Sequence, residues 1–213
     1  MMKYDPNKHH RRSIRLKGYE YTQAGGYFFT ICTSQRECLF GEVINGGMRL
    51  SRYGETVQFN WNILPKRYPN VELDAFIVMP NHVHGIIVLN GNGLEGAGKI
   101  SLSAGKSEFS VKPAPTKSKV YGLSEIVRGF KTFSARRINQ IRSQGAVPVW
   151  QRGYYEHIIR NEESLTAIRK YIINNPLCWK KDQLYSNNLG KWNESSPLVF
   201  ESNGKSYTQV IVL

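Results

Sequence analysis

The sequence predicts an α+β protein in which helices pack on an antiparallel sheet. Residues 27–33 form an aromatic and β-branched run after Gly25-Gly26, which predicts a central strand. Residues 74–89 predict two apolar strands joined at Pro80-Asn81, a pair of turn formers. Apolar residues recur at helical spacing over 123–142. Amphipathic helices bury their apolar faces against such a sheet.

The remaining elements are predicted from turn and capping residues. A hairpin is predicted over 39–50, around an Asn-Gly-Gly turn. A helix follows from Ser51, a suitable N-cap, to about residue 66. Residues 149–159 predict another strand, and a last helix spans 161–175 before a proline ends it.

We expect one domain with appendages, because 213 residues suffice for one good core but not comfortably for two. Residues 1–18 form a basic arm, and 19–179 form the domain. Residues 90–118 are rich in Gly, Ser, Lys and Pro and predict a mobile insertion. Residues 180–213 lose the apolar pattern and are expected to be a C-terminal appendage.

The charge of the chain indicates its class of partner. Lys and Arg total 29 against 16 acidic residues, a formal net charge of +13, and 12 tyrosines and 4 tryptophans are interleaved with them. This composition favours nucleic acid over an acidic small molecule. Binding to a membrane surface is the competing interpretation, but no basic amphipathic helix with a bulky exposed apolar face is predicted. No apolar run approaches the roughly 18 residues of a membrane span either, so no membrane partner is expected.

The compartment is predicted from the N-terminus and the cysteines. The polar, basic start has no apolar segment behind it, so no secretory signal is expected. Cys32, Cys38 and Cys178 have neither paired nor zinc-ligand spacing. We therefore expect a cytoplasmic protein, associated with the nucleoid.

Two histidines stand one residue apart on the second strand of the 74–89 pair. Side chains alternate between faces along a strand, so His82 and His84 point the same way. If the turn has two residues, Met79 lies opposite His82, and Ile77 lies opposite His84. Two imidazoles on one face suit a metal ion, but two hydrogen-bonded core histidines are the alternative.

A tyrosine and an asparagine share one face of the 161–175 helix. Tyr171 and Asn175 are four residues apart and hence one turn apart, beside the apolar stripe. Such a tyrosine is often only a residue at the rim of the core. An asparagine before a proline is often only a helix stop.

Taken together, these residues resemble the HUH single-strand endonucleases with one catalytic tyrosine. The sequence is most similar to the IS200-like transposases and, within them, to the REP-associated tyrosine transposases. The resemblance runs from residue 12 to 179, and the insertion at 90–118 departs from it by separating the two halves of the site. The matching stretches are residues 12–19, 27–33, 79–84, 149–157 and 171–175.

The resemblance implies a fold, a site and a reaction. The fold would be a ferredoxin-like sandwich, and His82, His84 and the side-chain oxygen of Asn175 would bind a divalent metal, Mg²⁺ or Mn²⁺. Tyr171 would attack a phosphodiester of single-stranded DNA beside a REP-like hairpin, forming a 5′-phosphotyrosine intermediate that allows rejoining. Tyr154 and Tyr155 are rival nucleophiles, but neither has a ligand-type residue one turn away. The protein would act as a monomer or a homodimer.

Basic residues are candidates for DNA contacts in two places. Those of the arm also fit simple solvation, and those of the long helix also fit a solvated helix face. The candidates are Arg11, Arg12, Arg15, Lys17, Arg128, Lys131, Arg136 and Arg137.

Two other functions fit parts of the pattern. One is a non-catalytic DNA or RNA hairpin-binding protein on the same fold, against which the complete set of site residues argues. The other is a metal-dependent hydrolase that uses water. Such an enzyme has no need of Tyr171, and the sequence pattern supplies no acidic ligand for a second metal.

Overall fold

The computed structural model describes residues 20–91, 119–143, 145 and 147–185, and the backbone of two strands at 197–202 and 205–210. The predicted arm, with Arg11, Arg12, Arg15 and Lys17, lies outside the described residues. Nearly all of the predicted insertion at 90–118 also lies outside them.

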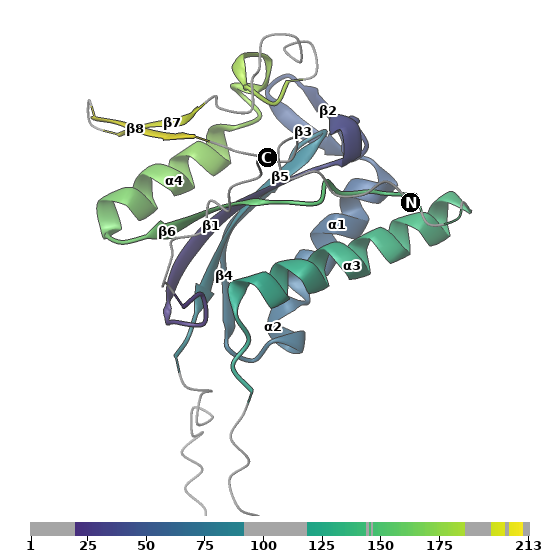
Figure 1. Cartoon of the computed structure of the whole chain (residues 1–213). Helices are drawn as coiled ribbons and strands as arrows, with labels where there is room; N and C mark the ends of the chain where they lie inside the picture. The colour runs from purple at the N-terminus through teal and green to yellow at the C-terminus, as the bar shows by residue number, and fades with distance from the viewer. Residues whose placement is uncertain are drawn as a thin grey trace, which may run out of the picture.

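The centre of the molecule is a four-stranded antiparallel sheet (Figure 1). The strand order is β4-β5-β1-β6, so β1 is central, as predicted. A hairpin and two successive helices connect β1 to β4, and one long helix connects β5 to β6. With the two successive helices taken as one helical connection, this is the βαββαβ order of a ferredoxin-like fold. The predicted fold class is therefore confirmed. The strands are β1 (Gly25–Cys32), β4 (Val71–Val78), β5 (His82–Leu89) and β6 (Tyr155–Ile159).

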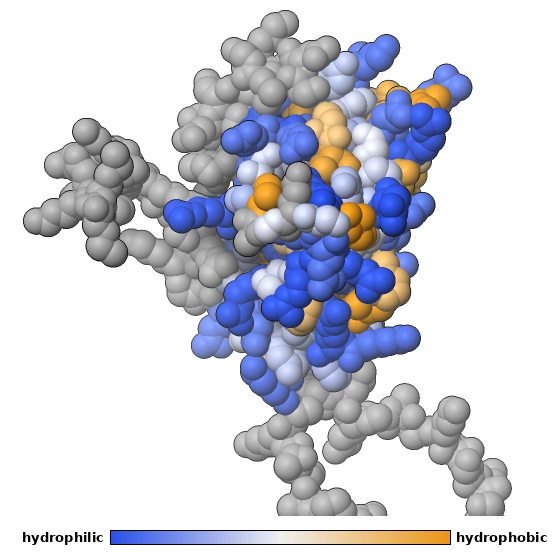
Figure 2. All heavy atoms as spheres, turned by 90° about the vertical axis from the view of Figure 1, so that its right-hand side faces the viewer, coloured by the Kyte–Doolittle hydropathy of each residue, from blue (hydrophilic) through white to orange (hydrophobic). Residues whose placement is uncertain are grey.

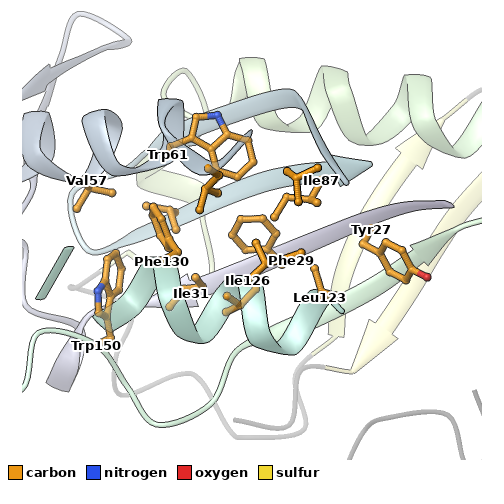
Figure 3. Packing of buried hydrophobic residues seen from close by; sticks show 14 of the residues in the cluster. Tyr27, Phe29, Ile31, Val57, Trp61, Ile87, Leu123, Ile126, Phe130 and Trp150 are labelled. Atoms are coloured by element: carbon orange, nitrogen blue, oxygen red, sulfur yellow. The ribbon is translucent and has the colours of Figure 1, made fainter. Parts of the chain in front are cut away.

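Helices cover both faces of this sheet (Figure 1). Helices α1 (Arg52–Asn62) and α3 (Leu123–Arg142) pack on one face and against each other. Helix α4 (Glu162–Asn174) packs on the other face, against β4 and β6. The main core lies under α1 and α3, where Trp61 meets Phe29 and Phe130 at ring-centroid distances of 5.8 and 6.5 Å (Figure 3).

The turn between β4 and β5 has two residues, as predicted. The Met79 amide donates to the His82 carbonyl at 2.8 Å, and Ile77 pairs with His84 in the register. Side chains alternate between the two faces of β5, so Val83 and Ile87 point into the core under α1 and α3, and Ile86 points into a smaller core under α4. The histidines share the face of Ile86. The strand register thus places them under α4.

Capping and turn residues set the boundaries around α1. The hairpin of β2 (Gly41–Ile44) and β3 (Gly47–Leu50) turns at Asn45-Gly46, both with positive φ (50° and 75°), as this tight turn requires. The Ser51 hydroxyl caps α1 by accepting from the amides of residues 53 and 54. The predicted helix is divided, because Pro65 has no amide hydrogen to continue α1 and a short α2 (Leu64–Arg67) follows.

The strand predicted over 149–159 is shorter in the structure. Only Tyr155–Ile159 form β6, and before them Trp150 makes a single bridge to Thr33. The carbonyls of residues 151–153 accept hydrogen bonds from the Lys131 ammonium instead of a neighbouring strand. Around the bridge, the Gln151 amide donates to the Cys32 carbonyl at 2.9 Å and the Ser34 amide donates to the Val149 carbonyl at 2.8 Å.

The chain after α4 returns to the sheet before it leaves the domain. A short 3₁₀ helix η2 (Trp179–Lys181) is followed by residues 182–185, with Leu184 buried. Beyond them, β7 (Pro197–Ser202) and β8 (Lys205–Val210) form a hairpin, and β7 lies beside α4 (Figure 1). A second 3₁₀ helix, η1 (Ser34–Arg36), follows β1. None of the helices in the described part is long and apolar enough to cross a membrane.

Candidate metal and nucleophile site

The two histidines of β5 lie side by side under α4. His82 and His84 are fully buried, and their ring centroids are 4.5 Å apart. Phe28 of β1 stacks against His84 at 5.6 Å, and Trp179 lies 5.8 Å from His82. The shared face predicted by strand alternation is confirmed.

Asn81, the second turn residue, orients the His82 ring. Its side-chain oxygen lies 2.8 Å from His82 Nδ1, while its amide donates to the carbonyls of Leu184 (2.7 Å) and Arg36 (3.3 Å). An amide oxygen only accepts, so Nδ1 carries the proton and Nε2 presents its lone pair. That Nε2 is buried and has no hydrogen-bond partner among the described residues. A buried imidazole held in this tautomer is typical of a metal ligand.

His84 connects the sheet to α4. Its Nδ1 is hydrogen-bonded to the Thr30 hydroxyl at 2.8 Å, and its Nε2 lies 3.2 Å from the Tyr171 hydroxyl. The predicted tyrosine therefore meets one of the predicted ligands directly.

Tyr171 and Asn175 project from α4 toward the histidines. The Asn175 amide donates to Asp182 Oδ2 at 3.0 Å, and its Oδ1 is buried without a hydrogen-bond partner among the described residues. Of the rival tyrosines, Tyr154 lies on the opposite face and reaches Ser124 at 3.4 Å. Tyr155 packs under α4 against Phe28, at 6.1 Å between ring centroids.

Asp182 is a site residue that the sequence analysis missed. One of its carboxylate oxygens and one nitrogen from each of His82 and His84 all lie within 4.8 Å of one another. It stands beyond the domain boundary predicted at residue 179, in a segment without apolar periodicity. The sequence carries one signal, because Asp182 is the sole acidic residue between Glu163 and Glu194.

Burial controls the protonation of the site. Burial, together with the charge of Arg36, lowers the pKa of His82 to about 3. Burial and the neighbouring His82 also hold the pKa of His84 well below its usual value, against the opposite effect of Asp182. Burial, and then the Asp182 carboxylate, raise the pKa of Tyr171 well above its usual value of 10.0. At neutral pH the imidazoles are thus uncharged and the phenol is protonated.

The donor set fits a metal ion. Two buried atoms, His82 Nε2 and Asn175 Oδ1, lack partners among the described residues, and an acidic oxygen lies beside the imidazoles. Unpaired buried acceptors are costly unless a ligand satisfies them. His82, His84 and Asp182 form a cluster that can hold a metal ion, without specifying which one.

The candidate DNA-contacting residues of α3 lie on the far side of the sheet from this site. Arg128, Arg136 and Arg137 are exposed, whereas the Lys131 ammonium is engaged by the carbonyls of residues 151–153. On the side toward which the C-terminal end of α3 points, Figure 2 shows a mostly hydrophilic surface with separate hydrophobic patches.

A comparison of sequences places the chain in a family, although no family model matches it. An uncharacterised protein of Haemophilus influenzae is 44% identical over 186 residues, which cover 86% of this chain and 97% of that protein. This chain belongs to the family of that protein. A second Haemophilus influenzae protein is 26% identical over 159 residues, covering 74% of this chain and 73% of its own length. Its name assigns it provisionally to the REP-associated tyrosine transposases.

The chain is thus similar to a protein named for the REP-associated tyrosine transposases, the family that its motifs resemble. Two solved structures are also similar in outline. One, a REP-associated tyrosine transposase bound to a REP hairpin, matches with a TM-score of 0.49 and 18% identity over 85% of this chain and 80% of that one. The other, provisionally named a transposase of Deinococcus radiodurans, matches with a TM-score of 0.41 and 17% identity over 76% of this chain and 97% of that one.

Proposed function

We propose that this family member is a transposase that cleaves and rejoins single-stranded DNA through Tyr171. The observation that carries the proposal is the position of the Tyr171 hydroxyl, 3.2 Å from His84 Nε2 and one helical turn from Asn175. A water-using hydrolase has no use for a tyrosine at this point. The sequence relationship to a protein named as a REP-associated tyrosine transposase supports the same activity.

The proposed reaction is a phosphoryl transfer to tyrosine. The Tyr171 oxygen forms a bond to phosphorus as the bond from phosphorus to the 3′ oxygen breaks. Tyr171 loses its proton and the 3′ oxygen gains one, which leaves a 5′-phosphotyrosine and a free 3′ hydroxyl. The phosphotyrosine bond conserves the energy of the cleaved linkage, so the reverse attack rejoins the strand.

The proposed metal is Mg²⁺ or Mn²⁺, with His82, His84 and Asn175 Oδ1 as ligands. When bound, such a cation polarises the scissile phosphate and stabilises the charge that develops on it. The chain itself keeps both imidazoles neutral by burial and holds His82 in the ligand tautomer through Asn81. It also places the nucleophile on a rigid helix rather than on a loop.

The proposed partner is single-stranded DNA with a REP-like hairpin, and α3 supplies a candidate surface for it. Three arginines lie over aromatic rings where α1 and α2 meet α3. They are Arg67 over Phe133 (3.9 Å), Arg137 over Phe59 (5.4 Å) and Arg142 over Tyr53 (5.2 Å). A guanidinium over a ring can still bind phosphate through its exposed N–H groups. Arg137 is exposed and suits this role best, whereas Nη1 of Arg67 is buried.

A covalent adduct tests the proposal. Full-length protein is incubated with Mn²⁺ and a set of single-stranded hairpins labelled on either side of the cut site, then denatured. The proposal requires that label 3′ of the cut remains attached to the protein, on a peptide that contains Tyr171. Hairpin binding without any adduct would favour the non-catalytic hairpin-binding protein. Cleavage without an adduct would favour a hydrolase, for which Asp182 now offers an acidic ligand.

The compartment and assembly remain proposals as well. All three cysteines are free, and two of them are exposed. We propose a cytoplasmic, nucleoid-associated protein, because exposed thiols persist in reducing compartments. Whether it acts as a monomer or a homodimer is decided by the mass of the protein in solution with and without a hairpin.

A further inference from the structure

Asp182 is held at the site by two hydrogen bonds. Its Oδ2 accepts from the Asn175 amide at 3.0 Å, and its Oδ1 accepts from the Leu184 amide at 2.6 Å. Leu184 is itself buried, and its carbonyl accepts from the Asn81 amide at 2.7 Å. The segment after η2 is therefore tied to the turn that orients His82 and to the helix that carries Tyr171.

We propose that Asp182 is a carboxylate ligand of the divalent cation, so that the segment 179–185 completes the active site. This inference rests on the metal of the proposed function. A cation with bonds of about 2.1 Å holds ligand atoms at most roughly 4.2 Å apart. The His82, His84 and Asp182 atoms already lie within 4.8 Å of one another. Small side-chain movements are enough to bring them into contact with one ion.

Charge gives the chemical reason for this ligand. Two neutral imidazoles and an amide oxygen offer a divalent cation no negative charge. Mg²⁺ and Mn²⁺ prefer hard oxygen ligands, and carboxylates above all. Asp182 is the acidic member of the cluster, so it supplies the negative charge that the other three ligands lack.

The hydrogen bond between Asp182 and Asn175 gives Asp182 a second role besides metal binding. The Asn175 nitrogen donates to Asp182, while its Oδ1 is buried and has no hydrogen-bond partner in the described part of the chain. Asp182 thus also orients the Asn175 amide. Metal binding by Asp182 and orientation of Asn175 by Asp182 can be separated by experiment. If Asp182 only orients Asn175, replacing Asp182 has no further effect on Mn²⁺ binding once the Asn175 amide has been removed.

Direct Mn²⁺ binding tests the assignment without DNA or activity. Mn²⁺ is titrated into the full chain by calorimetry, for the wild type, Asp182→Asn, Asn175→Ala and the double variant. We expect Asp182→Asn to weaken Mn²⁺ binding at least about 10-fold. We expect a comparable further loss when Asp182→Asn is added to Asn175→Ala. Leu184→Ala is the matched control, because it loosens the same segment and keeps the carboxylate.

Each other outcome overturns the assignment. Unchanged affinity in Asp182→Asn removes the ligand. Equal weakening in Leu184→Ala reduces Asp182 to a packing role, and no further loss in the Asn175→Ala background reduces it to a positioning residue. If Asp182→Asn does not fold, Asp182→Glu and Asp182→Gln are compared instead, because their side chains have nearly the same shape and differ in charge. Equal Mn²⁺ affinities of these two variants overturn the proposal.

The proposed function fails separately from this inference. A wild-type protein that binds no Mn²⁺ overturns both the metal site and Asp182 as its ligand. Asp182-dependent Mn²⁺ binding together with an absent DNA adduct overturns only the proposed reaction.

Discussion

The Tyr171 hydroxyl lies 3.2 Å from His84 Nε2, although 87 residues separate the two in the chain. The contact joins a strand of the central sheet to the helix that covers it. It also places a phenol with a raised pKa beside neutral imidazoles. Such a phenol is a weak nucleophile until the charge on its oxygen is stabilised, so the geometry couples the tyrosine to its neighbours.

Replacing the nucleophile should separate binding from chemistry. Tyr171→Phe removes only the hydroxyl, so it should retain hairpin affinity and abolish strand cleavage, which gel assays with labelled hairpins measure. Tyr155→Phe, in the same small core, is the matched control and should cleave normally. Normal cleavage by Tyr171→Phe, with loss in Tyr154→Phe or Tyr155→Phe, would identify a different tyrosine.

Removing the proposed ligands should reduce metal-dependent cleavage. His82→Ala and His84→Ala should each reduce it by at least the roughly 10–100-fold that loss of a supporting partner causes at metal sites. Asn175→Ala should cost less, because a neutral amide oxygen is the weakest of the three ligands. His157→Ala, a histidine of the same sheet on β6, is the control. Cleavage that continues undiminished in EDTA would exclude the metal.

The dependence of the free energy of unfolding on pH in the acidic range should depend on Asp74. Arg169 on α4 donates to both carboxylate oxygens of Asp74 on β4, at 2.9 and 2.5 Å, and this hydrogen bonding lowers the Asp74 pKa. A folded pKa below the unfolded value stabilises the protein above about pH 4, and this stabilisation is lost as the pH falls through the folded pKa.

Asp74→Asn should therefore lower the free energy of unfolding at pH 7, by up to about 1 kcal/mol for a partly exposed pair. Near pH 2 it should have little effect. Urea unfolding at both pH values measures the difference. Glu42→Gln removes an exposed pair with Arg49 and should change neither value. An equal loss at both pH values would show that Asp74 contributes packing rather than charge.

Salt titrations should show which basic residues contact DNA. Each lost phosphate contact lowers the slope of log affinity against log salt by roughly 0.7 for single strands and 0.9 for duplex DNA. Deleting residues 1–12, or combining Arg136→Glu with Arg137→Glu, should reduce both hairpin affinity and this slope. Gln140→Ala, at an exposed uncharged position of α3, should leave both unchanged. Unchanged curves for either basic variant would show that its residues are only solvated.

Local periodicity by itself determined most of the candidate site. Alternation along β5 placed His82 and His84 on one face, and the four-residue spacing on α4 placed Tyr171 and Asn175 one turn apart. The two-residue turn at Pro80-Asn81 set the register that the structure confirms. These features follow from backbone geometry over a few residues, so a sequence pattern carries them.

Tertiary structure alone decided how these pieces meet and what completes them. The Lys131 ammonium reaches the carbonyls of residues 151–153, some 20 residues away in the chain, where the sequence predicted strand. The orientation of His82 depends on Asn81, whose amide is held by the carbonyl of Leu184, 103 residues later. Asp182 joins the histidines because the chain turns back to the sheet after α4. No local period encodes that return, since single long-range hydrogen bonds and the burial of Leu184 stabilise it.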